Sequence, residues 1–223
     1  MFSLVKLDDP RARRRQATMD RILAAAWELA EEQGLAGISL RDLAARVDLR
    51  QPSLYSYFDS KHALYDAMFA QGCEQMLEGL HAHPVNGDGH GVVKEMARRV
   101  VALSVENPAR AQLLFQRTIP GFEPSAASYA IAQRMFEEGR TRLASVGLTK
   151  DRQMDMYTAL IAGIVAQQLA NDPGGTRWTR LVDEMVDMYL DHNRGNGSRN
   201  EAEARSPKAS RPRAERPIER GGK

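Results

Sequence analysis

The sequence predicts an all-α protein in which an N-terminal three-helix unit with a helix-turn-helix precedes a larger helical body. Apolar residues recur at three- and four-residue spacing along most of the chain, which is the period of an α-helix. Alternating strand patterns and hairpin turns between apolar runs are absent. With 223 residues and 43% hydrophobic content, the chain is long enough to form two modest domains with a real core.

The first predicted helix follows a basic segment, residues 1–17, that carries Arg11, Arg13, Arg14 and Arg15. Such an arm adds affinity for nucleic acid by releasing counterions, or it is simply a solvated tail. The net charge of +2 does not by itself mark a nucleic-acid binder. We assign residues 18–60 to the N-terminal domain, and the apolar positions of its first helix are Ile22, Leu23, Ala24, Ala25, Ala26 and Leu29.

Two short helices separated by a tight turn are predicted between residues 39 and 60. Ser39 is a good N-cap, and Asp42 three residues later resembles the partner in a capping box. Asp48 stands where the chain must reverse, and Asp tolerates turn conformations. Pro52 fits the first turn of the second helix, where backbone amides have no intrahelical partner. The buried face of the first short helix is expected to consist of Leu40, Leu43, Ala44 and Val47. Ser60 is expected to cap the helix that follows the second short one.

The second short helix carries polar side chains suited to DNA. Leu54 and Phe58 point inward at positions i and i+4, which leaves Gln51, Ser53, Tyr55 and Tyr57 on the other faces. An amide matches base edges, and hydroxyl and phenol groups match phosphate oxygens. A cation at a helix N-terminus, such as Lys61, is unfavourable unless an anion such as a phosphate lies nearby. A plain helical corner is the alternative interpretation of these residues.

From about Arg14 to Gly72 the chain resembles the N-terminal DNA-binding domain of the TetR family of bacterial one-component regulators. The resemblance continues through Gly34 and Ile38-Ser39 and is densest in Gln51–Phe58 and Ser60-Lys61. It implies that Arg41, Gln51, Pro52 and Tyr55 lie at base edges and that Ser39, Ser53, Tyr57 and Lys61 hold phosphates. Two positions depart from the family's usual pattern, since Asp48 replaces a glycine and Tyr57 replaces a histidine.

The body, residues 61–194, is predicted to contain only helices. The helix begun at Ser60 should stop at His83-Pro84, and residues 85–91 should form a loop. Helices are expected over 92–106, 108–116, 125–147 and 178–192, with a break over 118–124 and a further helix capped by Thr149. Residues 195–223 are rich in Gly, Ser, Pro, Arg and Glu and are predicted to form a disordered basic tail.

The helix near residues 159–170 is apolar on nearly every side, so it must be covered on every side. The resemblance implies that the last two helices pair with those of a second copy, while a central core helix is the alternative. A homodimer would present two recognition helices to a palindromic operator. The predicted interface residues are Leu160, Ile161, Ile164, Leu181, Met185 and Met188.

The resemblance also implies that the body binds a small-molecule effector. The candidate lining of a lipophilic site is Met68, Met76, Phe115, Phe122, Met135, Phe136 and Tyr157. Met suits an adaptable wall, although such residues at helical spacing are usually core. Polar groups are offered by Gln116, Arg117, Gln167 and Gln168. The expected function is a repressor that a ligand releases from DNA, and the alternatives are a constitutive DNA-binding protein and a helical interaction protein.

Enzyme, metal and membrane functions are not expected. The sequence has no Walker motif, dinucleotide-binding glycine pattern or Gly-x-Ser-x-Gly, so no cofactor is predicted. Cys73 is the only cysteine and has no nearby base, and a reducing compartment suits it. His81, His83 and His90 lack the partners of a confident metal site. No apolar run approaches about 18 residues and no signal peptide begins the chain, so a cytoplasmic protein is expected.

Overall fold

The computed structural model describes residues 9–82 and 89–205, and every regular element in these ranges is helical. The prediction of an all-α protein is therefore confirmed for the part of the chain described. The elements in order are α1 (Pro10–Gln33), η1 (Leu35–Gly37), α2 (Leu40–Arg46), α3 (Gln51–Tyr55), α4 (Lys61–His81), α5 (Gly89–Glu106), α6 (Pro108–Phe115), α7 (Ala126–Ala144), α8 (Asp151–Asn171), η2 (Thr179–Leu181) and α9 (Val182–Arg205).

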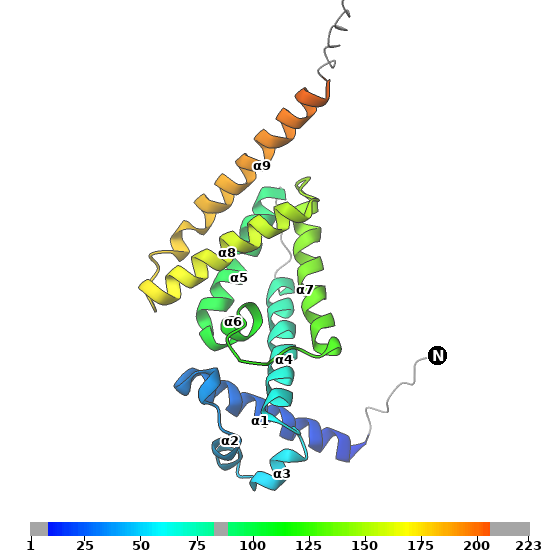
Figure 1. The fold of residues 1–223 in the computed structure, drawn as a ribbon, viewed down its shortest axis with the longest axis vertical. Helices are drawn as coiled ribbons and strands as arrows, with labels where there is room; N and C mark the ends of the chain where they lie inside the picture. Colours follow the sequence, from blue (N-terminus) through cyan, green and yellow to red (C-terminus); the bar gives the residue numbers. More distant parts are fainter. Residues whose placement is uncertain (1–8, 83–88, 206–223) are drawn as a thin grey trace, which may run out of the picture.

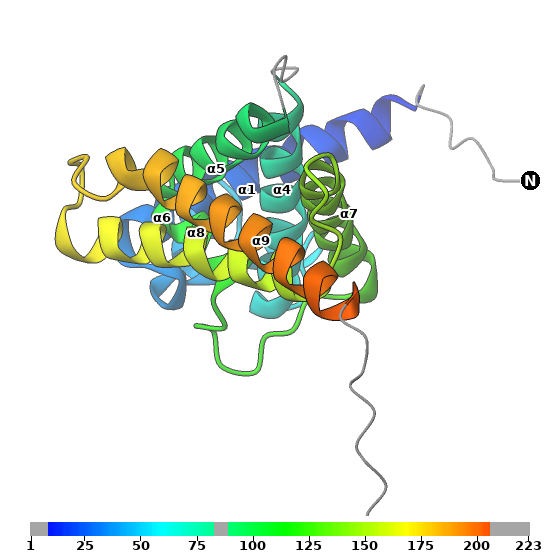
Figure 2. The same cartoon turned by 90° about the horizontal axis from the view of Figure 1, so that it is seen from above.

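Helices α1 to α3 form one end of an elongated molecule, here called the head, and α5 to α9 form the body (Figure 1). Helix α4 begins in the head and runs into the body without an intervening linker (Figure 1). Helices α8 and α9 lie side by side at the far end of the body, which is also clear from above (Figure 2).

The local signals in the helix-turn-helix act as expected. The Ser39 hydroxyl accepts a hydrogen bond from the Asp42 amide at 3.3 Å, and the Ser60 hydroxyl accepts one from the Ala63 amide at 3.0 Å. Asp48 has a φ of 56°, the left-handed conformation that a turn requires and that Asp tolerates. The two residues predicted to point inward, Leu54 and Phe58, are 1% and 3% exposed.

The core of the head extends beyond the helix-turn-helix. It includes Leu64, Met68 and Phe69 of α4, and residues of α6 and α7 pack against the same cluster. A second core lies between α5, α8 and α9, where Tyr157 and Tyr189 meet edge to face at 5.8 Å. The Arg98 guanidinium also joins α5 to α9 by binding Asp183 at 2.6 Å. The head therefore shares a continuous packed core with the near end of the body.

Three helix starts differ from the prediction. Helix α1 begins at Pro10 after the N-cap Asp9, so the four arginines expected in a basic arm lie in its first two turns. Helix α5 begins at Gly89 rather than at residue 92, while residues 85–88 of the expected loop lie outside the described ranges. Helix α8 begins after Lys150 rather than Thr149, and the Lys150 amide donates to Gln153 Oε1 at 3.0 Å.

The last helix is longer than expected. Residues 179–181 form the short η2, and α9 then continues through Arg205, whereas a disordered tail was predicted from residue 195. Residues 201–205 read Glu-Ala-Glu-Ala-Arg, and all three residue types favour helix, but residues 195–200 read Gly-Asn-Gly-Ser-Arg-Asn, so intrinsic propensity accounts only for the last part of the extension. The rest of the expected tail, residues 206–223, lies outside the described residues. Within the described ranges, no helix is both long and apolar enough to cross a membrane.

Candidate DNA interface and ligand cavity

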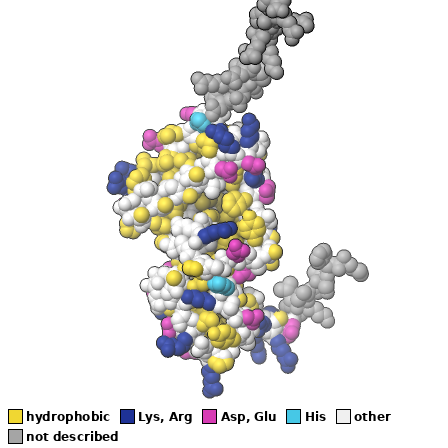
Figure 3. All heavy atoms as spheres, in the orientation of Figure 1, with side chains coloured by type: hydrophobic (Ala, Val, Ile, Leu, Met, Phe, Trp, Pro, Cys, Tyr) yellow, Lys and Arg dark blue, Asp and Glu magenta, His cyan; other side chains and the backbone are white. Residues whose placement is uncertain are grey.

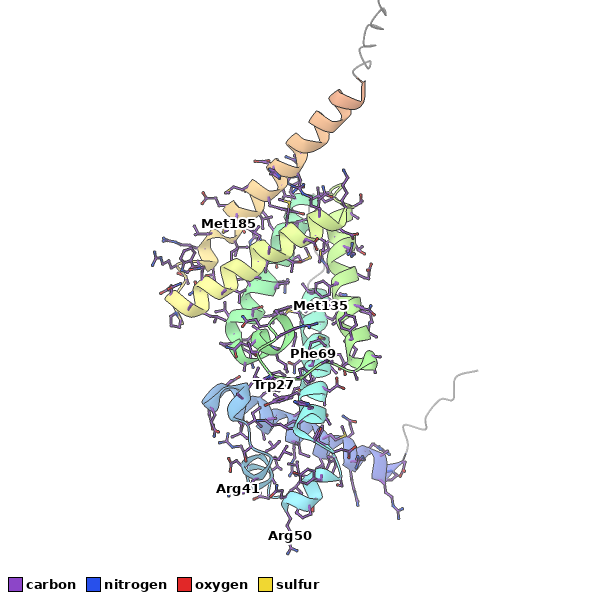
Figure 4. All side chains as sticks on the ribbon, in the orientation of Figure 1. Trp27, Arg41, Arg50, Phe69, Met135 and Met185 are labelled. Atoms are coloured by element: carbon purple, nitrogen blue, oxygen red, sulfur yellow. The ribbon has the colours of Figure 1, made fainter. Side chains whose placement is uncertain are left out.

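The predicted base-edge residues gather at the outer end of the head. Gln51, Pro52 and Tyr55 are all exposed on α3, and Tyr55 is 44% exposed. Arg41 on α2 is exposed and contacts Asp42 at 3.7 Å. Arg41 lies on the side of the head turned away from the body (Figure 4). The structure thus brings the four residues onto one solvent-facing end, although their contact with DNA stays a prediction.

Arg50 is a candidate that the sequence reasoning missed. It is the N-cap residue of α3, makes no side-chain cap bond, and is exposed. Figure 4 shows its side chain extending away from the tip of the head. The signal was available, because the N-terminal residues of a recognition helix are the ones that reach base edges. Basic side chains are prominent at this end of the molecule (Figure 3).

The predicted phosphate residues have more varied surroundings. Ser53 is exposed, Ser39 and Tyr57 are partly buried, and the Ser39 hydroxyl already caps α2. The Lys61 ammonium donates to the Ala36 carbonyl at 2.9 Å and lies 5.5 Å from the centre of the Tyr65 ring. Lys61 therefore stabilises the fold of the head, a role that the sequence analysis did not predict.

Three hydrogen bonds tie the head to the helices behind it. The Tyr65 hydroxyl donates to the Leu35 carbonyl at 2.5 Å, and burial raises the pKa of Tyr65 to about 12, so the phenol keeps its proton at neutral pH. The Trp27 indole donates to Gln71 Oε1 at 2.8 Å. The Asn107 amide, at the start of α6, donates to Glu31 on α1 at 2.8 Å. Trp27 and Phe69 mark this junction (Figure 4).

A cavity of about 280 Å³ lies in the body between α4, α5, α6, α7 and α8. Five of the seven predicted ligand residues line it, namely Met76, Phe115, Met135, Phe136 and Tyr157. Its polar lining consists of neutral groups such as Gln116, Ser104 and Thr158, and no charged side chain lines it. Because an unpaired charge is costly to bury, this chamber suits an uncharged, largely apolar molecule or part of one.

A second cavity of about 380 Å³ adjoins the first along the C-terminal end of α6. The two share Leu114, Phe115 and Gln116, and the second also contains Arg117 and Phe122. The Phe122 ring packs on α4, with its centre 5.8 Å from that of Tyr65, 6.1 Å from His62 and 6.5 Å from Phe69. This cavity therefore borders the part of α4 that enters the head.

Three of the predicted ligand contacts line neither cavity. Met68 is fully buried in the core of the head and lines neither cavity, because α4 turns that face toward α1. Gln168 is also fully buried, but its amide holds the turn after α8 by accepting from the Trp178 amide at 2.9 Å and donating to the Gly175 carbonyl at 3.1 Å. Gln167 is exposed on α8 and lines neither cavity.

The predicted dimer interface needs correction on α8. Ile161 and Ile164 are 5% and 2% exposed because they pack inside the body, so they are not available to a second copy. Leu160, Leu181 and Met185 are partly buried, whereas Met188 is 64% exposed. The exposed side of α8 instead carries a row of small residues, Ala159, Gly163, Ala166 and Ala170.

The residues considered for other chemistry have ordinary surroundings. Cys73 is buried, and this burial raises the pKa of its thiol to about 12, which makes it a poor nucleophile at neutral pH. His81 faces Glu138 at 3.5 Å, His90 contacts Arg194, and His83 lies outside the described residues. No three metal-ligating side chains cluster in the described ranges.

Comparisons with known proteins agree with this geometry. Residues 22–68 match the family described as bacterial regulatory proteins, tetR family. The HTH-type transcriptional repressor DrrR1 of Streptomyces coeruleorubidus is 33% identical over 172 residues, which cover 74% of this chain and 58% of that protein. The chain spans between 48% and 58% of the length of three such relatives.

Solved structures share the fold over most of the chain. The TetR family transcriptional regulator PfmR from Thermus thermophilus has a TM-score of 0.58 at 20% identity and covers 77% of this chain and 98% of its own. The transcriptional regulator FadR from Bacillus subtilis, in complex with stearoyl-CoA, has a TM-score of 0.59 at 16% identity and covers 77% and 97%. Residues 22–68 therefore form a DNA-binding domain of the TetR family of bacterial regulatory proteins, and the helical body that follows shares the fold of solved TetR-family regulators.

Proposed function

We propose that this regulator is a repressor that binds a palindromic operator as a homodimer and is released by a small, largely apolar ligand. The observation that carries the proposal is the uncharged cavity of about 280 Å³, whose wall includes Met76 and Leu80 of the helix that enters the head. Repression is supported by the relative DrrR1, which is a repressor. Operator binding would place the protein in the cytoplasm.

The DNA-binding part of the proposal rests on the exposed end of the head. Arg41, Arg50, Gln51, Pro52 and Tyr55 would face base edges. Guanidinium and amide groups match guanine and adenine edges in pairs of hydrogen bonds. The predicted phosphate contacts, Ser39, Ser53, Tyr57 and Lys61, would fix the register of the head on the duplex. A single short α3 supplies few base contacts, so useful specificity requires two heads.

The dimer would form through the outer face of α8 together with α9. Small residues on α8 allow a second helix to approach closely, and Met188 on α9 offers an exposed apolar side chain that a partner would cover. The inward residues Ile161 and Ile164 would support this face from below without contacting the partner.

Release would follow from a change in the direction of α4. A ligand shifts the equilibrium only by its differential affinity for the two states. A preference of about 100-fold for the state that does not bind DNA supplies about 2.7 kcal/mol, which is enough to release an operator of moderate affinity. A ligand that is mostly apolar suits the uncharged cavity. The FadR structure shows that a regulator of this fold can hold a ligand with a long acyl chain.

The proposal is tested by measuring operator affinity of the full chain in the presence of uncharged probes, for example n-alkanols of increasing length. We expect a long-chain alkanol to weaken operator binding about 100-fold at saturation. Val100→Trp, which fills the cavity from α5, should abolish this response while leaving the affinity without ligand unchanged. Operator affinity that no probe alters, in either protein, would favour a constitutive DNA-binding protein.

A further inference from the structure

Two arginines of α1 hold the ends of both helices of the helix-turn-helix. Arg15 Nη2 donates to the carbonyl of Ser56 at 2.9 Å, and Ser56 is the C-cap of α3. Arg21 Nη2 donates to the carbonyl of Val47 at 2.9 Å, and Val47 is the C-cap of α2. Each helix of the motif therefore ends against one guanidinium group from the same neighbouring helix.

A guanidinium group at a helix C-terminus has a clear physical effect. The last carbonyls of a helix lack intrahelical hydrogen-bond donors and carry partial negative charge. A cationic donor there supplies a hydrogen bond and also interacts favourably with that charge. Helix α2 has 7 residues and α3 has 5, which is too short for either helix to be stable on its own. Their direction therefore depends on tertiary contacts. In α3, the buried side chain of Leu54 supplies one such contact. The hydrogen bond from Arg15 to the Ser56 carbonyl, at the C-terminal end of the helix, supplies another.

Arg15 also lies against a side chain of the predicted DNA surface. Its guanidinium carbon is 4.8 Å from the centre of the Tyr57 ring, which is a cation–π contact. Tyr57 is partly buried, and its phenol belongs to the predicted phosphate set. One residue of α1 therefore fixes both the C-terminal end of α3 and the ring that follows it.

Arg14 provides a contrast on the same helix. It is exposed, and its side chain forms no hydrogen bond or ion pair with the part of the chain that the structure describes. The two neighbouring arginines thus differ in their contacts. The Arg15 guanidinium contacts the Ser56 carbonyl and the Tyr57 ring, whereas the Arg14 guanidinium makes no such contact within the described residues.

We propose that Arg15 and Arg21 are positioning residues of the DNA interface, which set the direction of α3 relative to α1 and do not themselves bind phosphate. The inference rests on the operator binding proposed above. It follows that Arg15 governs discrimination between sequences, whereas Arg14 is free to add affinity that is independent of sequence.

The test compares Arg15→Gln with the matched control Arg14→Gln in the full chain. Binding to an operator fragment selected by the wild type and to an unrelated duplex is measured by fluorescence anisotropy over a range of KCl concentrations. Arg15→Gln should weaken operator binding about tenfold, the loss expected for a hydrogen bond from a charged donor, with an unchanged salt slope and little effect on the unrelated duplex. Arg14→Gln should reduce the salt slope by about 0.9 on both duplexes.

An equal reduction of the salt slope by Arg15→Gln on both duplexes would make Arg15 a phosphate contact and overturn the proposal. Wild-type behaviour of Arg15→Gln in every measurement would overturn it as well. Arg15→Lys, which keeps a charge over Tyr57 and one donor for Ser56, should recover most of the discrimination. Arg21→Gln should lose discrimination in the same way as Arg15→Gln.

Amide hydrogen exchange separates this inference from the function on which it rests and from general loss of stability. Arg15→Gln should accelerate exchange in residues 51–58 without accelerating it in α5. Acceleration throughout the chain would mean that Arg15 only stabilises the fold, which contradicts the proposal. If the wild type preferred no DNA sequence, the proposed function would fail, and the exchange pattern would still decide whether Arg15 orders α3.

Discussion

Gly163 lies in the middle of the outer face of α8, and a Cβ atom built there meets no other atom within 4 Å. An alanine methyl group at this position therefore meets no steric clash within one copy of the chain. Glycine in a helix interior is less stable than alanine by about 0.5–1 kcal/mol, because it loses more conformational freedom on folding. Gly163→Ala should accordingly raise the free energy of unfolding of a monomer by about that amount.

In a dimer that forms through this face, a large side chain at residue 163 should instead be destabilising. A leucine at a close helix crossing forces neighbours apart, and overpacking of this kind costs about 1–3 kcal/mol. Two-fold symmetry places the substitution in both copies, so Gly163→Leu should weaken association by about 2–6 kcal/mol, or roughly 30-fold and upward.

Sedimentation equilibrium at micromolar concentration measures this effect, with Ala130→Leu on the exposed face of α7 as the matched control. We expect the wild type and Ala130→Leu to be dimers and Gly163→Leu to contain folded monomers that bind the operator poorly. A Gly163→Leu protein that dimerises as tightly as the wild type would refute the assignment of this face. Gly163→Leu monomers that are unfolded would contradict the expectation that residue 163 can hold a side chain without a clash within one copy.

Four other substitutions test three separate parts of the molecule. Gln51→Ala and Arg50→Ala should each cost about 1–3 kcal/mol on the operator and relax preference at one position per half-site, which binding to systematically substituted operators will show. Lys61→Ala should lower the salt slope of DNA binding by about one and also lower the thermal midpoint; a lower midpoint with an unchanged salt slope would leave Lys61 with its structural role alone. Asp183→Asn should lower the midpoint at pH 7, and its difference from the wild type should shrink as the pH falls below about 4, as thermal melts across pH will measure. The hydrogen bond from Arg98 holds the pKa of Asp183 below its usual range, so this stability is present above about pH 4 and lost as the pH falls through the folded-state value.

The sequence by itself determined the features that depend on neighbours along the chain. Ser39 and Ser60 cap helices because a hydroxyl and the amides it accepts from lie within three residues, whatever surrounds them. Asp48 marks a turn for a similarly local reason. The two inward residues of the recognition helix, Leu54 and Phe58, were predictable because helical spacing alone places them on one face.

Tertiary structure decided which of two similar residues has which role. Met68 and Met76 both lie on one side of α4, but only Met76 reaches the cavity, because the head packs against the first half of the helix and the body against the second. On α8, Ile161 and Ile164 turn inward while Ala159 and Gly163 are exposed, which an all-round apolar pattern does not reveal. Arg15 and Arg21 find carbonyls 41 and 26 residues away, so their difference from Arg14 arises only when the chain brings α1 against both short helices. Periodicity states that a side chain is apolar or charged, whereas the packing of distant segments determines what it contacts.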